Sequence, residues 1–274
     1  MILYRYLNAT RGVDFLRSLK LCFTPPKYFN DINEFSPFIE RTFTRRQYRS
    51  YFLTESYLRP VWKSWVRSGL TSLTLEQFMA AARADEAVFK EITERVSWAC
   101  TGLEKSFKNV MSEHTGVCCL SETATSNLMW AHYSDAHRGI CVGMELNHSD
   151  IRLAYVVRVK YRDRKIRIPP WFLELTELQR NHFYKEIASS KGTEWSYEKE
   201  HRLIGNLEDC QTLQIDNRTE YFQFLDHRDI RTVTLGFQCT ADAEIQEAVA
   251  PHKDFWHVTR CVQEPESFLL RLTT

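Results

Sequence analysis

The segment Lys191–Arg202 places the strongest constraint on how this chain folds, because it alternates charged and aromatic side chains and leads directly into the apolar pair Leu203–Ile204. In an extended strand, residues two apart share a face. Read as one strand, the segment gathers two carboxylates and a guanidinium on one side: Ser196, Glu198, Glu200 and Arg202. Such a face is either a functional site or a structural network of ion pairs, and the remaining motifs must distinguish the two.

Composition predicts a globular protein with a substantial core, since 43% of its 274 residues are hydrophobic. The 36 Lys and Arg residues nearly balance the 35 Asp and Glu residues, which gives a net charge of +1. This balance argues against bulk attraction to nucleic acid or to an anionic membrane, although it leaves room for a local basic patch.

The eight cysteines contain no Cys-x-x-Cys pair, so we expect no structural zinc site and no metal cofactor. No apolar stretch approaches the ~18 residues that a membrane-spanning helix needs. The N-terminus also lacks the basic and apolar regions of an export signal. We therefore expect a cytoplasmic protein with reduced thiols and no membrane partner.

Local patterns predict one α+β domain over residues 1–274 with a helical insertion at about 37–112. Strands are expected at 1–6, 20–24, 116–121, 138–145, 151–161, 230–236 and 257–261. Helices are expected at 10–19 with Thr10 as its cap, at 127–133 with Ser126 as its cap, at 172–187 and at 240–250. The polar loop around Asp31 and Glu34 is either a turn built from Asn and Asp side chains or a cation site.

The order of motifs resembles an uncharacterised, mainly bacterial family, domain of unknown function 2971. The first motifs that carry this resemblance are Leu3-Tyr-Arg-Tyr6, Leu21-Cys-Phe-Thr-Pro25, Tyr28-Phe-Asn-Asp31 with Glu34, Cys119-Leu-Ser121 and Leu128-Met-Trp-Ala-His-Tyr133. The later ones are His137-Arg-Gly-Ile-Cys141, Lys191 with Trp195, Tyr197-Glu-x-Glu200 with Arg202, and Leu235-Gly236. The chain departs from the family at Asp31-Ile-Asn-Glu34, where a proline–aromatic–acid continuation is more common.

The same order is similar to that of a wider group, the ADP-ribosyltransferase-like fold. This resemblance implies a mixed, split β-sheet and NAD as substrate. It implies that Arg5 or Tyr6 forms the first element of the site, that Ser121 and Tyr133 form the second, and that Glu200 or Glu198 supplies the catalytic carboxylate. Arg5 would then bind pyrophosphate, Ser121 a ribose and Tyr133 the nicotinamide ring, while Arg202 holds the carboxylates.

Each of these residues also has a structural interpretation: Tyr6 as a core aromatic, Ser121 as the end of a strand, and the Glu198–Arg202 face as an ion-pair network. Three functional hypotheses follow. The first is an enzyme that transfers ADP-ribose from NAD to a protein or nucleic acid, or hydrolyses NAD, as a bacterial toxin or phage-defence effector does. The second is a non-catalytic module that binds a ligand or protein in the same charged cleft. The third is a metal-assisted hydrolase or nuclease that uses Asp31, Glu34 and the late carboxylates.

Overall fold

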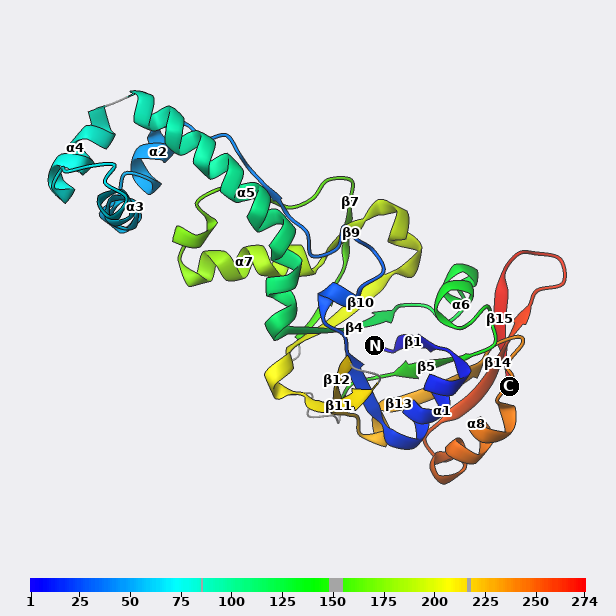
Figure 1. Cartoon of the computed structure of the whole chain (residues 1–274). Helices are drawn as coiled ribbons and strands as arrows, with labels where there is room; N and C mark the ends of the chain where they lie inside the picture. The colour runs from blue at the N-terminus through cyan, green and yellow to red at the C-terminus, as the bar shows by residue number, and fades with distance from the viewer. Residues whose placement is uncertain (85, 148–154, 216–217) are drawn as a thin grey trace. The chain divides into compact units, whose positions relative to one another are not determined.

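The computed structural model describes residues 1–84, 86–147, 155–215 and 218–274, and their helices and strands confirm the predicted α+β class (Figure 1). The chain divides into two compact units. The first contains Met1–Glu34, Asn109–Asp163 and Ser189–Thr274, and the second contains Phe35–Lys108 and Arg164–Ala188. No helix of the described residues is both long and apolar enough to cross a bilayer.

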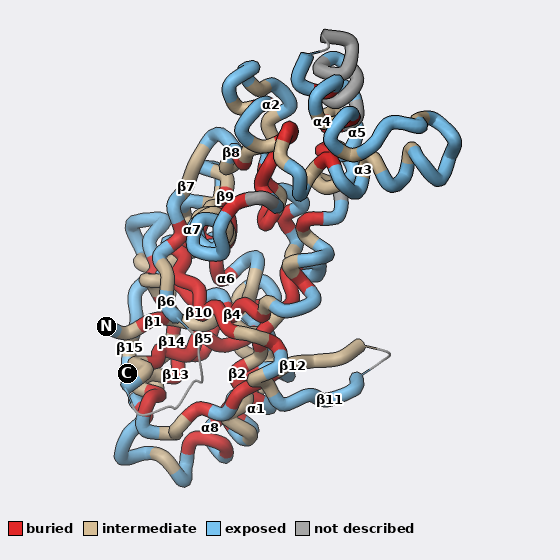
Figure 2. The backbone as a smooth tube through the Cα atoms, turned by 90° about the vertical axis from the view of Figure 1, so that its left-hand side faces the viewer, coloured by how far each residue is buried: buried red, intermediate tan, exposed pale blue. Residues whose placement is uncertain are grey.

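The first unit is built on a mixed sheet, which has eight strands in the described part of the chain, in the order β15-β14-β13-β5-β1-β4-β10-β6. Only β13 and β14 pair in parallel; the other neighbours are antiparallel. The strands are β1 (Leu3–Leu7), β4 (Thr115–Ser121), β5 (Ile140–Met144), β6 (Tyr155–Arg158), β10 (Glu200–Asn206), β13 (Ile230–Leu235), β14 (His257–Gln263) and β15 (Leu270–Thr273). The central strands are the most buried, so the hydrophobic core lies against the middle of the sheet (Figure 2).

Helices cover both faces of this sheet (Figure 1). On one face, α1 (Ala9–Ser18) and α8 (Asp242–Val249) pack on an aliphatic core that includes Phe15, Val142 and Leu203. On the other face, α6 (Asn127–Tyr133) buries Trp130 beside Tyr6. Because residues that alternate along a strand face opposite sides, Tyr4 and Tyr6 face α6 while Leu3 belongs to the α1 side.

The predicted caps are right for one helix and wrong for another. Ser126 caps α6 by accepting from the N–H of Met129. Helix α1 is capped by the Asn8 side chain, which accepts from the N–H of Arg11, and not by Thr10. Asn is at least as good a cap as Thr, so the cap lies two residues earlier than predicted and the helix begins at Ala9.

A second, three-stranded sheet joins β2 (Lys20–Phe23) to the hairpin of β11 (Gln211–Ile215) and β12 (Arg218–Phe224), in the order β11-β12-β2. Beyond its end, Thr24 forms an isolated bridge with Val117 of β4. Strands β1 and β4 pair at Tyr4 and Ser121 alone. The main sheet is therefore split between β1 and β4, and the end of β2 fills part of the gap.

Other predicted elements of the first unit need partial revision. The expected strand at 151–161 forms β6 and β7 (Lys160–Arg162), while its residues 151–154 lie outside the described residues. Strand β7 pairs in parallel with β9 (Ser190–Gly192). Short 3-10 helices complete this unit: η1 (Pro26–Tyr28), η3 (Thr193–Glu198), η4 (Leu207–Asp209), η5 (His227–Asp229) and η6 (Ala250–His252).

The second unit is mainly helical. Its elements are β3 (Phe38–Ile39), α2 (Arg45–Tyr51), α3 (Glu55–Arg67), α4 (Leu75–Ala84), α5 (Glu86–His114, up to Lys108), β8 (Arg167–Ile168), η2 (Phe172–Glu174) and α7 (Glu177–Ala188). Thr44 and Gln47 form a capping box at the start of α2. The short strands β3 and β8 pair in parallel, which ties residues 164–188 to the earlier segment of this unit.

Candidate active site

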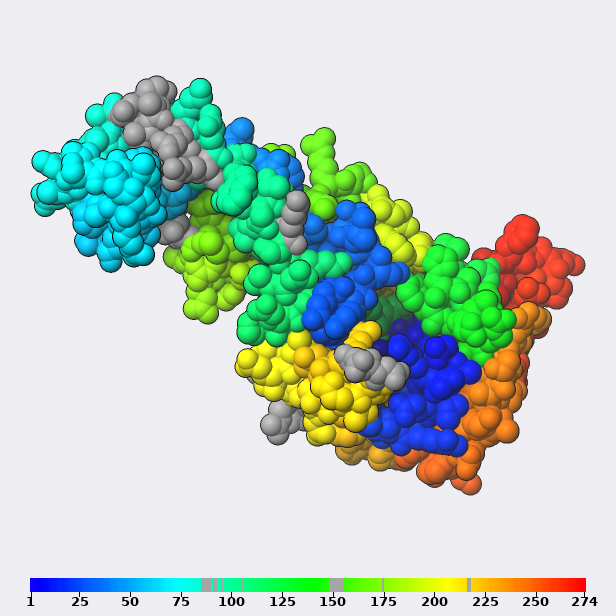
Figure 3. Space-filling view, viewed as in Figure 1, coloured from blue at the N-terminus to red at the C-terminus, as the bar shows by residue number. Residues whose placement is uncertain are grey.

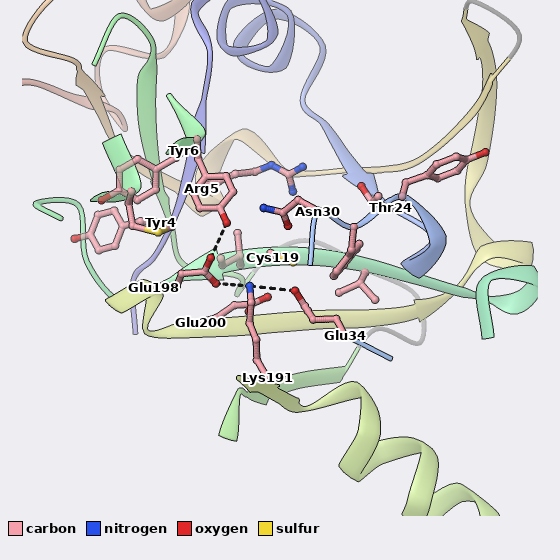
Figure 4. A pocket seen from close by; sticks show the side chains of 16 residues that line it. Tyr4, Arg5, Tyr6, Thr24, Asn30, Glu34, Cys119, Lys191, Glu198 and Glu200 are labelled. Atoms are coloured by element: carbon pink, nitrogen blue, oxygen red, sulfur yellow. Dashed lines mark hydrogen bonds and ion pairs between the residues drawn. The ribbon is translucent and has the colours of Figure 1, made fainter. Parts of the chain in front are cut away.

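A cavity of about 340 Å³ opens in the first unit where the sheet splits (Figure 4). Its walls come from β1, β4, α6, the loop after η1 and the segment 191–200. The residues that line it include Arg5, Cys119, Tyr133, Lys191, Glu198 and Glu200. Segments that are distant in sequence therefore supply one pocket.

The split also leaves main-chain groups facing this cavity. Val117 exchanges both of its main-chain hydrogen bonds with Thr24, at 3.0 and 2.8 Å. Because residues two apart on a strand direct their N–H and C=O groups to the same side, the peptide groups of Cys119 also point into the gap. Among the described residues, no strand pairs with Cys119 on that side.

The segment Lys191–Arg202 is not the single strand that its alternation predicts. Strand β9 ends at Gly192, residues Thr193–Glu198 form the helix η3, and Lys199 adopts a left-handed conformation with φ 45° before β10 begins. Two aromatic residues of this turn make polar contacts. The Lys191 ammonium lies 4.7 Å from the centroid of the Trp195 ring, and the Tyr197 hydroxyl lies 3.3 Å from His132 Nδ1. The prediction of one extended charged face was wrong, but the turn still brings Glu198 and Glu200 to the same cation.

That cation is Lys191, which lies between three carboxylates (Figure 4). Its Nζ is 2.6 Å from Glu198 Oε2, 3.3 Å from Glu200 Oε2 and 3.2 Å from Glu34 Oε1. The Lys191 side chain is only 5% exposed, and its three partners are no more exposed than that. Buried charges need such partners, because the cost of removing an isolated ion from water is several kcal/mol or more.

Arg202 is the second cation of this cluster. Its Nε donates to Glu200 Oε1 at 2.8 Å, and its Nη2 donates to Glu200 Oε2 at 3.0 Å and to Glu34. Fully ionised, the cluster of Glu34, Lys191, Glu198, Glu200 and Arg202 carries three negative and two positive charges. The excess of one negative charge therefore favours protonation of one of its carboxyl groups.

The environments of the three carboxyl groups separate their pKa values. Burial raises the pKa of Glu34 and of Glu198 above the usual range, despite the nearby cations. Burial acts the same way on Glu200, but Arg202 and Lys191 outweigh it and lower the pKa of Glu200 to about 2. Glu200 is thus ionised at neutral pH, while Glu34 and Glu198 are carboxyl groups that take up a proton more readily.

Tyr133 supports this distinction, because its hydroxyl donates to Glu198 Oε1 at 2.6 Å. Burial, followed by the hydrogen bond to Glu198, raises the pKa of Tyr133 well above that of an ordinary phenol. Tyr133 therefore stays protonated and acts as a hydrogen-bond donor at the pocket wall. The predicted site residues Tyr133, Glu198 and Glu200 meet in one place.

Ser121 and Arg202 belong to the support of the site rather than to the pocket wall. The Ser121 hydroxyl is fully buried and donates to the main-chain carbonyl of Glu198 at 2.6 Å. Arg202 is also fully buried, behind Glu200. Neither side chain lines the cavity, so both position the carboxylates and lack direct access to a ligand.

Tyr6 is a core aromatic residue that also reaches the wall of the cavity. Its ring packs edge-on against Trp130 at 5.2 Å, as a core aromatic does, and its hydroxyl donates to the carbonyl of Thr123 at 2.8 Å. Tyr6 also lines the cavity. It forms an apolar wall whose polar end is already occupied.

Arg5 is a half-buried cation at the cavity. Its Nη1 donates to the carbonyl of Cys22 at 3.4 Å and contacts the Cys118 thiol. Within the described residues, Arg5 has no carboxylate at ion-pair distance, unlike Lys191 and Arg202. A guanidinium has five N–H donors, so Arg5 retains donors for an anionic ligand.

Sequence reasoning missed the central role of Lys191 and considered Glu34 only as a possible cation ligand. The turn prediction for this loop is confirmed locally, since the N–H of Asn33 donates to Asp31 Oδ1 at 2.8 Å. Glu34 nevertheless joins the charge cluster through a contact with Arg202, 168 positions away. A buried pairing over that distance leaves no signal in local spacing.

Residues 129–203 match the model of a family described as a protein of unknown function, DUF2971. This match confirms the family resemblance over a segment that includes Tyr133, Lys191, Glu198, Glu200 and Arg202. Comparisons with curated proteins and with solved structures return no match to the chain.

Proposed function

We propose that the pocket binds NAD and cleaves its nicotinamide–ribose bond, with transfer of ADP-ribose to an acceptor or to water. The observation that carries the proposal is the separation of two neighbouring carboxyl groups into Glu200, which is ionised at neutral pH, and the proton-exchanging Glu198. The same pocket also holds Arg5, which has no carboxylate at ion-pair distance among the described residues. Pairs of carboxyl groups with separated pKa values are typical of acid–base and glycosyl-transfer sites.

The chemistry assigns each group a step. The C–N bond breaks, nicotinamide leaves with the electron pair, and positive charge develops on the ribose carbon. Glu200, which is ionised throughout, stabilises that charge electrostatically. The acceptor hydroxyl then bonds to the ribose carbon and loses its proton to Glu198, whose raised pKa makes it a stronger base than an ordinary carboxylate.

In this proposal, the substrate is bound by pocket residues outside the charge cluster. Arg5 offers N–H donors to the pyrophosphate, in the charge-assisted geometry that guanidinium groups favour. Tyr133 and Tyr6 present aromatic surface to the nicotinamide ring. A protein or nucleic acid is the acceptor that suits a toxin or phage-defence effector, and hydrolysis of NAD is the corresponding reaction with water.

A second candidate function is a non-catalytic module that binds an anionic ligand in this pocket. The favouring observation is that Glu200 is already held by two hydrogen bonds from Arg202. These bonds offset part of the charge that catalysis would use. Under this alternative, the ligand is recovered chemically unchanged.

The test is NAD consumption by the purified chain, followed by chromatography of NAD, nicotinamide and ADP-ribose in the presence and absence of acceptors. We expect Glu200→Gln to lower turnover at least a hundredfold, with a circular-dichroism spectrum like that of the wild type. Glu194→Gln is the matched control, because Glu194 is an exposed carboxylate of the same segment. Its turnover should equal that of the wild type.

Two outcomes would contradict the proposal. Intact NAD that raises the melting temperature would favour the binding module. Intact NAD with no thermal shift would remove both candidate functions for this ligand.

A further inference from the structure

A second, smaller pocket of about 110 Å³ lies in the first unit between α1 and the sheet β11-β12-β2. Figure 3 shows the N-terminal segment (blue) packed against the β11–β12 hairpin (yellow), in agreement with the pairing of β2 and β12. Arg5 lines this pocket as well as the larger one, so one guanidinium separates the two cavities. Apart from Arg5, the proposed function uses no residue of the smaller pocket.

The smaller pocket gathers six charged side chains from four strands and helices: Arg5, Arg11, Asp14, Lys20, Arg218 and Glu220. Four are cations and two are anions, which gives a local charge of +2. Burial raises the pKa of the Cys22 thiol on β2, and the charges that also act on it come from Arg5, Glu220, Arg11 and Asp14. Four of the six charged groups therefore act on the same thiol.

The charges in this pocket do not neutralise one another. In the described ranges of the chain, none of the six forms an ion pair within 4 Å, whereas the Lys191 cluster is fully paired. The Nε atom of Arg218 is buried and has no hydrogen-bond partner among the described residues. Its guanidinium is held in place by stacking on Tyr28, at 3.8 Å from the ring centroid. This buried, oriented N–H group is therefore open to an acceptor that enters the pocket.

We propose that this pocket is a second anion site, which binds a phosphate group through Arg11, Lys20, Arg218 and Arg5. A phosphate matches the planar fork of Arg and the point charge of Lys, and its charge of about −2 balances the local charge of +2. Pockets for nucleotide-sized ligands are typically about 300–1,000 Å³, so this one fits a compact phosphate or a small phosphate monoester. Asp14 and Glu220 restrict it further, because a polyanion such as nucleic acid would meet their charges.

The experiment is a titration of the full chain with inorganic phosphate, followed through amide chemical shifts, with chloride added to hold ionic strength constant. We expect saturable shifts in 11–14 and 218–221. Arg11→Gln and Lys20→Gln should each weaken phosphate binding about tenfold, because each removes one charged donor. Both residues lie outside the larger cavity, so binding there would be unaffected.

Arg17→Gln is the matched control. Arg17 is an exposed arginine of the same helix that pairs with Glu247, and it does not line the pocket. Phosphate affinity in this variant should equal that of the wild type. Shifts that fail to saturate, affinity that survives in Arg11→Gln and Lys20→Gln, or an equal loss in Arg17→Gln would each overturn the proposal. These outcomes are independent of NAD turnover.

Discussion

Replacement of Lys191 by Met tests whether the buried charge cluster holds the first unit together. Lys191 contacts Glu34, Glu198 and Glu200 between 2.6 and 3.3 Å, and its side chain is 5% exposed. The variant leaves three buried carboxyl groups with one cation, Arg202. Removal of one partner from a buried ion pair costs about 3–5 kcal/mol. We expect Lys191→Met to lower the free energy of unfolding by about 3 kcal/mol at pH 7, the lower end of that range, because protonation of Glu198 relieves part of the excess negative charge.

The assay is urea denaturation followed by circular dichroism and tryptophan fluorescence, at pH 7 and at pH 5. The loss should be smaller at pH 5, since the orphaned carboxyl groups take up protons more readily there. Lys253→Met is the control, because Lys253 is exposed and lies outside the cluster. It should change the free energy of unfolding by less than about 0.5 kcal/mol.

The double variant Lys191→Met/Glu198→Gln tests whether the loss comes from the orphaned carboxylates. Neutralising Glu198 removes one of the orphaned charges, so we expect it to restore about 1–2 kcal/mol relative to Lys191→Met alone. A loss below about 1 kcal/mol in the single variant, or additive losses in the double variant, would refute the idea that Lys191 holds the carboxylates together.

Three further predictions concern single groups. Glu200 has a folded-state pKa of about 2 against an ordinary 4.5, so it should contribute about 3 kcal/mol of stability above pH 4.5, and this contribution is lost as pH falls towards 2. Urea denaturation at pH 7 and at pH 3 should therefore show a smaller drop in the free energy of unfolding for Glu200→Gln than for the wild type. Tyr133→Phe removes a hydrogen bond that favours ionised Glu198, so the pKa of Glu198 should rise. The acidic limb of the pH–rate profile for NAD cleavage should then move up by about one pH unit. An unmoved limb would show that Glu198 is not the base that titrates there. Gly139→Ala would drive a Cβ into the main-chain carbonyl oxygen of Leu7 and should lower the free energy of unfolding by several kcal/mol. Gly102→Ala, inside α5 with open space around it, should raise the free energy of unfolding by up to about 1 kcal/mol in urea denaturation.

Local sequence patterns predict most of the elements of the first unit, because strong alternation or helical spacing marks them. The helix over 127–133 and its Ser126 cap are examples. The same reasoning overlooked the β11–β12 hairpin and the terminal strand β15. Strand β11 is exposed throughout, so the sequence pattern there carries no signal of a buried face.

Only part of the candidate site could be predicted from sequence, because its groups come from distant segments of the chain. The carboxylates of Glu198 and Glu200 stand out in sequence because they lie two positions apart in a charged motif. Their different acid strengths depend on Arg202, Lys191 and Glu34, which the fold brings together across β9, β10 and the loop after η1. Ser121 lies opposite Glu200 in the register of β4 and β10, so its role in holding the Glu198 carbonyl needs that register to be known.

The opening between β1 and β4 has a consequence for inhibitor design. The N–H and C=O groups of Cys119 point into the gap and have no strand partner there among the described residues, much as groups at the edge of a sheet do. A planar primary carboxamide can pair with both groups, as an added strand would. No side-chain substitution removes a main-chain contact of this kind. Compounds anchored there would keep that part of their affinity in variants that lose Glu198 or Glu200, so resistance by substitution of the pocket walls would be incomplete.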